Sequence, residues 1–129
     1  MKTATLIARI VLGLVFVVFG LNGFLHFLPQ PAMPQEAIAF FGALAASRYM
    51  LPLLFAQQIV GGALVLAGMV PLGLAILAPV IVNIVAFHLF LAPDGMPLAI
   101  VVCALALFLA WTYRRAYAPL FALRSAAGA

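Results

Sequence analysis

Six polar side chains interrupt the long apolar stretches of this sequence, and they are of types that bind ligands through hydrogen bonds or proton exchange. Four are amides and two are imidazoles, which can transfer protons near neutral pH. A single intramembrane amide is often only a contact between helices, contributing about 0.6 kcal/mol. Six together favour a hydrated cavity, because exposure to lipid is costly. The predicted ligand-binding residues are Asn22, His26, Gln57, Gln58, Asn83 and His88.

The two histidines could act in either of two ways, as hydrogen-bonding and proton-exchanging groups or as ligands of a haem. Asn22 precedes His26 by four residues, so the two share one helical face and the amide can orient the ring. Asn83 and His88 lie about 140° apart around an ideal helix and need not point to one place. Histidines on two helices can also be the axial ligands of a haem. That interpretation is less favoured, because histidines near the end of a span are common as interfacial hydrogen-bonding residues.

Other reactive residues are few. Cys103 is the only cysteine, so the chain has no internal disulfide, no C-x-x-C motif and no cysteine metal cluster. Both acidic residues, Glu36 and Asp94, fall in predicted loops, where they cannot couple ions across a membrane. The sequence therefore predicts no catalytic residue and no metal ligand, leaves the cofactor unknown, and favours a chain without catalytic activity of its own.

The composition is that of a membrane protein. Of 129 residues, 69% are hydrophobic and 6% are charged, whereas soluble domains are about half apolar. The apolar runs are too continuous for the alternating strands of a barrel, so an all-α integral membrane four-helix bundle is predicted, as one domain over residues 1–129. Membrane lipids are the expected partners. The net charge of +4 comes from scattered cations, a distribution that argues against nucleic-acid binding.

Four stretches approach the roughly 20 apolar residues that a spanning helix needs. Pro29, Pro31 and Pro34 end the first and form a loop. A short helix over 37–46 should follow, at the interface or re-entrant as a lid. A signal peptide is the alternative for the first stretch, but its apolar run is too long, so we expect the segment to be retained. The predicted spans are 4–28, 49–69, 72–91 and 96–117.

Proline and glycine indicate how the spans pack. Pro79 lies inside the third span, where it removes one intrahelical hydrogen bond and predicts a kink whose freed carbonyl needs a partner. Small residues let membrane helices approach closely. Close contacts between helices are therefore predicted at Gly13, Gly20, Gly61 and Gly62.

The cations indicate the orientation, because cytoplasmic segments carry an excess of Lys and Arg. Both termini are expected in the cytoplasm, at a cell (inner) membrane. A rise of 1.5 Å per residue then places all six polar side chains in the outer half of the membrane, while Arg9 can snorkel to the inner headgroups. The third connection carries only Asp94, whereas five cations lie near the ends of the chain: Lys2, Arg9, Arg114, Arg115 and Arg124.

Two segments carry a family resemblance. Residues 9–20 read RIVLGLVFVVFG, and residues 58–68 read QIVGGALVLAG. These resemble the first and second helices of the DoxX-like family of small four-helix membrane proteins. The family often has Glu where Gln58 stands and Lys where Gly23 stands, so an acid–lysine pair is missing here. The resemblance implies a membrane subunit; some members accompany sulfur- or oxidant-handling enzymes and exchange electrons with quinone, and distant eukaryotic relatives assist membrane-protein assembly.

Three functions follow in order of preference. The first is a non-catalytic membrane subunit or assembly partner, whose outward cavity binds a lipid, a quinone headgroup or a segment of a protein partner. The second is a membrane component of a quinone-linked oxidoreductase, in which His26 or His88 exchanges a proton with the quinone. The third is a small-solute transporter. A homo-oligomer is compatible with each of them.

Overall fold

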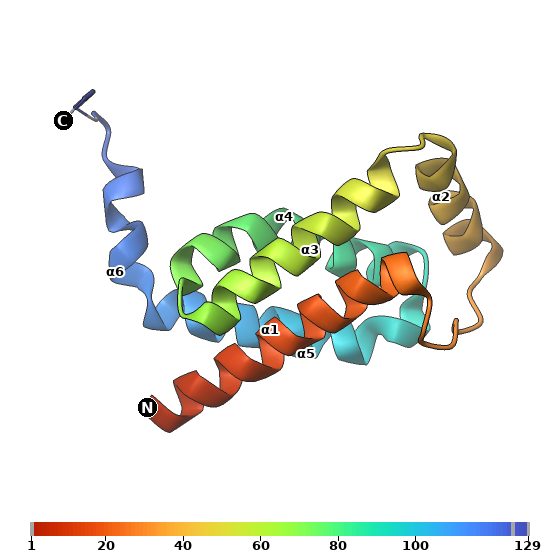
Figure 1. Cartoon of the computed structure of the whole chain (residues 1–129), viewed down its shortest axis with the longest axis horizontal. Helices are drawn as coiled ribbons and strands as arrows, with labels where there is room; N and C mark the ends of the chain where they lie inside the picture. The colour runs from red at the N-terminus through yellow and green to blue at the C-terminus, as the bar shows by residue number, and fades with distance from the viewer. Residues whose placement is uncertain (1, 125, 129) are drawn as a thin grey trace.

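The computed structural model describes residues 2–124 and 126–128, and its regular elements are all helices (Figure 1). No strand occurs within these residues, which confirms the predicted all-α fold. The elements in chain order are α1 (Lys2–Leu25), α2 (Gln35–Ala46), α3 (Met50–Ala67), α4 (Val70–Phe90), η1 (Pro93–Gly95), α5 (Met96–Thr112), α6 (Arg114–Tyr117) and η2 (Ala118–Phe121).

Among the described residues, four helical stretches are long and apolar enough to cross a membrane: α1, α3, α4 and Pro93–Thr112, which joins η1 to α5. At most 33% of the residues in the apolar window of any of them are buried inside the bundle. Most of their apolar side chains therefore face outward, an arrangement that lipid tails solvate and water does not. The chain is a multi-pass membrane protein, as predicted.

The four spanning helices form an antiparallel bundle. α3 packs between α1 and α4, α4 packs against α5, and α5 returns to contact α1. Figure 1 shows both termini at one end of the bundle and α2 at the other. The core is closed by side chains that are fully buried, one or two from each helix: Leu12, Phe16, Val65, Leu77 and Leu109.

Glycines set the close approach of α3 to both of its neighbours. A Cβ atom added at Gly62 would lie 2.8 Å from the carbonyl oxygen of Gly13 in α1. A Cβ added at Gly73 of α4 would lie 2.8 Å from the carbonyl oxygen of Gly61. Adjacent residues of α3 thus face different helices, Gly62 toward α1 and Gly61 toward α4. A Cβ at Gly20 would lie 2.9 Å from the Phe55 carbonyl oxygen, so the predicted close contacts are confirmed.

The fourth span ends earlier than predicted. α5 stops at Thr112, and Tyr113 has φ −98° and ψ 17°, outside the helical region. The chain then turns into α6 and η2, which leave the direction of α5 (Figure 1). The predicted stretch 96–117 therefore joined two elements. The charges explain the break, because Arg114 and Arg115 favour the headgroup region over the hydrocarbon.

α2 is the short helix expected between the first two spans, and it begins directly after Pro34. Glu36 lies in its first turn, where a carboxylate complements the positive end of the helix dipole. Phe40 and Phe41 of α2 contact Phe87 of α4, with ring centroids 5.7 Å and 5.2 Å from it. This aromatic cluster holds α2 against the end of the bundle that lies opposite the termini.

Candidate ligand groove and the placement of the polar residues

Gln57 joins α3 to α4 beside the proline of α4. Its Nε2 donates a hydrogen bond of 2.8 Å to the carbonyl oxygen of Ile76. Pro79 has no N–H to offer the Ala75 carbonyl, and its ring crowds the preceding turn. The predicted partner for a carbonyl near Pro79 is therefore Gln57, although it bonds the carbonyl of Ile76 and not that of Ala75, the preceding residue. In hydrocarbon such a bond stabilises the contact between the two helices.

A groove lies next to this bond, between α2, α3 and α4. Its volume is about 340 Å³. Two of its nine lining residues are amides, Gln57 from α3 and Asn83 from α4. Gln57 donates to Ile76, whereas Asn83 is the exposed amide of the groove. The apolar walls are Phe40, Leu44, Met50, Leu53, Leu54, Pro79 and Val80.

The first predicted pair, Asn22 and His26, lies at the end of α1. The Asn22 Oδ1 accepts a hydrogen bond of 2.7 Å from the backbone N–H of Leu28. The backbone N–H of His26 donates to the Asn22 carbonyl at 2.8 Å, and His26 has φ 53°. The Asn22 carboxamide oxygen thus fastens the loop after α1 rather than the His26 ring. His26 itself is exposed.

His88 lies at the end of α4 and contacts the turn before α5. Its Nδ1 donates to the carbonyl oxygen of Ile84 at 2.8 Å, since a carbonyl only accepts, and the ring packs edge-on against Phe87 at 5.1 Å. A Cβ added at Gly95 would overlap the His88 ring. The ring therefore fills the space that a glycine leaves in the turn, and it does not line the groove that contains Asn83.

Gln58 is the most buried of the six, with 8% of its surface exposed. It lies one residue from Gln57 on α3, so the two side chains point about 100° apart. The structure brings Gln57 and Asn83 together in the groove, and it places Asn22, His26, Gln58 and His88 elsewhere. A binding role for those four stays a prediction. Within the described residues, no three His, Cys, Asp or Glu side chains gather as metal ligands.

The guanidinium of Arg9 in α1 binds the C-terminal end of α3. Its Nη2 donates to the Leu66 carbonyl at 3.1 Å and its Nε to the Val65 carbonyl at 3.4 Å. These carbonyls belong to the last turn of α3, which ends at Gly68 in the left-handed conformation, with φ 99°. The guanidinium therefore caps a helix C-terminus, where a cation also complements the dipole.

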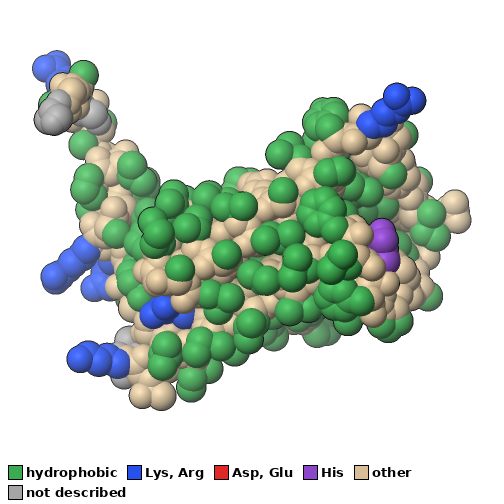
Figure 2. Space-filling view, viewed as in Figure 1, with side chains coloured by type: hydrophobic (Ala, Val, Ile, Leu, Met, Phe, Trp, Pro, Cys, Tyr) green, Lys and Arg blue, Asp and Glu red, His purple; other side chains and the backbone are tan. Residues whose placement is uncertain are grey.

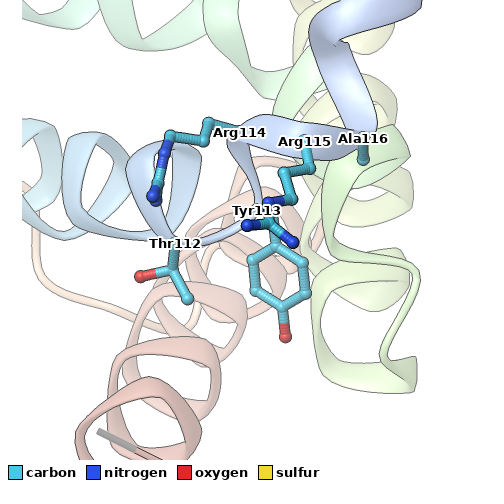
Figure 3. A pocket seen from close by; sticks show the side chains of 5 residues that line it. All are labelled: Thr112, Tyr113, Arg114, Arg115 and Ala116. Carbon is cyan, nitrogen blue, oxygen red and sulfur yellow. The ribbon is translucent and has the colours of Figure 1, made fainter.

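A second cavity, of about 410 Å³, lies at the end of the bundle that holds the termini. Figure 3 shows its lining residues at the turn between α5 and α6: Thr112, Tyr113, Arg114, Arg115 and Ala116. Arg114 donates to the Trp111 carbonyl at 2.8 Å, and its guanidinium carbon lies 4.4 Å from the centre of the Trp111 ring. Sequence reasoning missed this cavity, although adjacent arginines after an aromatic residue were its signal.

Tyr117 ties α6 to the start of α4. Its hydroxyl donates a hydrogen bond of 2.7 Å to the carbonyl oxygen of Pro71. Partial burial raises the pKa of the Tyr117 hydroxyl above its ordinary value of 10.0. The neutral, donating form is therefore favoured at physiological pH, and the contact fixes the direction in which the chain leaves the cavity lined by Arg114 and Arg115.

Comparison of the whole chain with protein-family models, with curated proteins and with solved structures gave no match.

Proposed function

We propose that this chain is a non-catalytic membrane subunit or assembly partner of the DoxX-like type, and that the groove between α2, α3 and α4 binds the polar head of a lipid or a quinone. The main support is the lining of the groove, in which apolar walls surround one exposed amide, Asn83. Ligand sites commonly combine apolar walls with a few polar groups that orient the ligand.

The size of the groove favours a ring or a headgroup over a whole lipid. Its volume of about 340 Å³ lies near the lower end of the range for small-molecule sites. A tail would therefore remain among the surrounding lipids. The Asn83 amide offers both a donor and an acceptor, so it can bind the carbonyl of a quinone or of a lipid ester, or a headgroup hydroxyl.

The proposed orientation puts this groove in the outer half of a cell (inner) membrane. Asn83 lies late in α4, which runs toward the end of the bundle opposite the termini. The excess of cations near the termini favours the cytoplasm for that end. A ligand would then enter from the outer leaflet, beneath α2. The alternative occupant of the same groove is a segment of a protein partner.

Mass spectrometry of the lipid extract tests the proposal directly. The gently purified full-length chain should carry a quinone or a lipid that is enriched over the bulk membrane extract. Asn83→Leu removes the amide but keeps the apolar walls, and it should lower this enrichment about fivefold, as expected for one lost hydrogen bond. Val82→Leu is the matched control, since Val82 is the neighbouring residue of α4 and 69% exposed. Wild-type protein with bulk lipid composition, or Asn83→Leu with undiminished enrichment, would contradict the proposal.

A further inference from the structure

The acidic residues of this protein are separated from most of its cations along the bundle. Figure 2 shows most of the visible Lys and Arg side chains at the end where the termini lie, further Lys or Arg atoms at the opposite end, and hydrophobic side chains over the sides of the helices. Both acidic residues lie at the opposite end, Glu36 in the first turn of α2 and Asp94 in η1. One of the six cations, Arg48 between α2 and α3, lies at that end too. The two acidic side chains are therefore not placed to offset the positive charge of the cations at the terminal end.

Two of these cations line the open surface cavity of Thr112, Tyr113, Arg114, Arg115 and Ala116, here called the arginine cavity. Arg114 is oriented by its hydrogen bond to the Trp111 carbonyl and by its contact with the Trp111 ring. Arg115 lines the same cavity, and Figure 3 shows its side chain close to that of Tyr113. The cavity thus presents two arginine side chains, and arginine binds phosphate through paired N–H donors.

The position of the cavity indicates which phosphate it meets. It begins at Thr112, the last residue of the fourth span. Just before it on α5 lie Leu107 and Trp111, which are 64% and 68% exposed and stand four residues apart on one face. A ligand seated at the arginines would thus have an apolar surface running into the hydrocarbon beneath it. Tryptophan and tyrosine at this depth are typical of the headgroup level.

We propose that the cavity of Thr112, Tyr113, Arg114, Arg115 and Ala116 binds the phosphate of an anionic phospholipid, with an acyl chain along Leu107 and Trp111. Basic pockets at the ends of membrane helices bind anionic headgroups in this way. The site lies at the opposite end of the bundle from the groove of Asn83. Its test is therefore independent of the function proposed above.

Native mass spectrometry of the full-length chain in detergent tests the assignment. Phosphatidylglycerol and phosphatidylcholine are titrated separately, and the Kd of the first bound lipid is measured. Wild type should bind phosphatidylglycerol more tightly. Arg115→Gln should weaken that binding about fivefold, the effect expected for one basic residue near an anionic group, and should leave phosphatidylcholine binding unchanged. Arg115→Lys keeps the charge but loses the paired donors, so it should recover only part of the affinity. Circular dichroism confirms that each variant is folded.

Two further arms separate this site from general charge and from soluble phosphate. Arg124→Gln removes the same charge from the C-terminal segment outside the cavity, and it should change the Kd by less than about twofold. Inorganic phosphate should not displace the bound phosphatidylglycerol. An equal loss in Arg124→Gln, equal binding of the two lipids by wild type, or displacement by inorganic phosphate would each overturn the assignment.

Discussion

The Gln57 amide of α3 donates a hydrogen bond of 2.8 Å to the carbonyl oxygen of Ile76. Ile76 lies three residues before Pro79 on α4. This bond gives the two amides of the groove different roles. Gln57 joins α3 to α4 close to the proline of α4, and Asn83 is exposed, where it would meet the proposed ligand. Stability and ligand binding should therefore respond to different substitutions.

Gln57→Leu should lower the free energy of unfolding by about 1 kcal/mol, because the hydrogen bond that joins α3 to the Ile76 carbonyl of α4 is lost. Asn83→Leu should leave stability unchanged or raise it slightly, since the side chain is exposed on a spanning helix and leucine is the better residue in hydrocarbon. Unfolding of both variants by added SDS, followed by circular dichroism, measures the difference. Equal destabilisation by the two substitutions would argue against the separate roles.

Gly62→Ala should destabilise the bundle by about 1 to 3 kcal/mol, since the new methyl group meets the backbone oxygen of Gly13 and the helices must separate. Gly42→Ala is the matched control. A Cβ at Gly42 has no atom within 4 Å, and alanine is the better helix former by about 1 kcal/mol, so α2 should be unaffected or stabilised. Thermal unfolding in one detergent compares them. A Gly62→Ala protein as stable as wild type would show that α1 and α3 are not held at this distance.

Arg9→Gln should lower stability by about 1 to 2 kcal/mol, because the last turn of α3 loses a charged donor for its Val65 and Leu66 carbonyls. Lys2→Gln removes an equal charge from an exposed position of the same helix and should have little effect. The same unfolding measurement distinguishes capping from net charge, and comparable losses in the two variants would favour net charge.

The free energy of unfolding should depend on pH in the alkaline range, because of the Tyr117 hydroxyl. Burial raises the pKa of its hydroxyl in the folded state, so its bond to Pro71 stabilises the fold fully below about pH 10. Above that pH the unfolded state loses its proton first, and the contribution is lost as pH rises through the folded pKa. The tyrosinate absorbance of wild type minus that of Tyr117→Phe should titrate with a midpoint above 10. A midpoint at or below 10 would contradict the buried contact.

The spans could be predicted from sequence because apolar length and proline punctuation are local properties. The break after Thr112 could not, since the following residues through Tyr117 remain compatible with a helix. The contact of Tyr117 with Pro71, 46 residues away, becomes visible only once α5 and α4 lie side by side. The close contacts at glycines could also be predicted, because a glycine inside an apolar run is a local feature. Which helix each glycine contacts could not be predicted.

The candidate site was predicted less completely, because depth along a helix says nothing about the partners that a side chain finds. Asn22 and His88 lie near helix ends, where unsatisfied backbone groups compete for polar side chains. Their hydrogen bonds go to Leu28 and Ile84. Gln57 and Asn83 share the groove because α3 and α4 are adjacent and antiparallel, a relationship that belongs to the tertiary structure.

The topology of the groove is tested most directly by cysteine labelling in intact cells. In a Cys103→Ser background, Gln35→Cys places a thiol at the start of α2, near the groove, and Ala127→Cys places one near the C-terminus. A membrane-impermeant maleimide should label Gln35→Cys in intact cells and Ala127→Cys only after permeabilisation. The opposite pattern would move the groove to the cytoplasmic side, and labelling of both positions in intact cells would contradict four crossings.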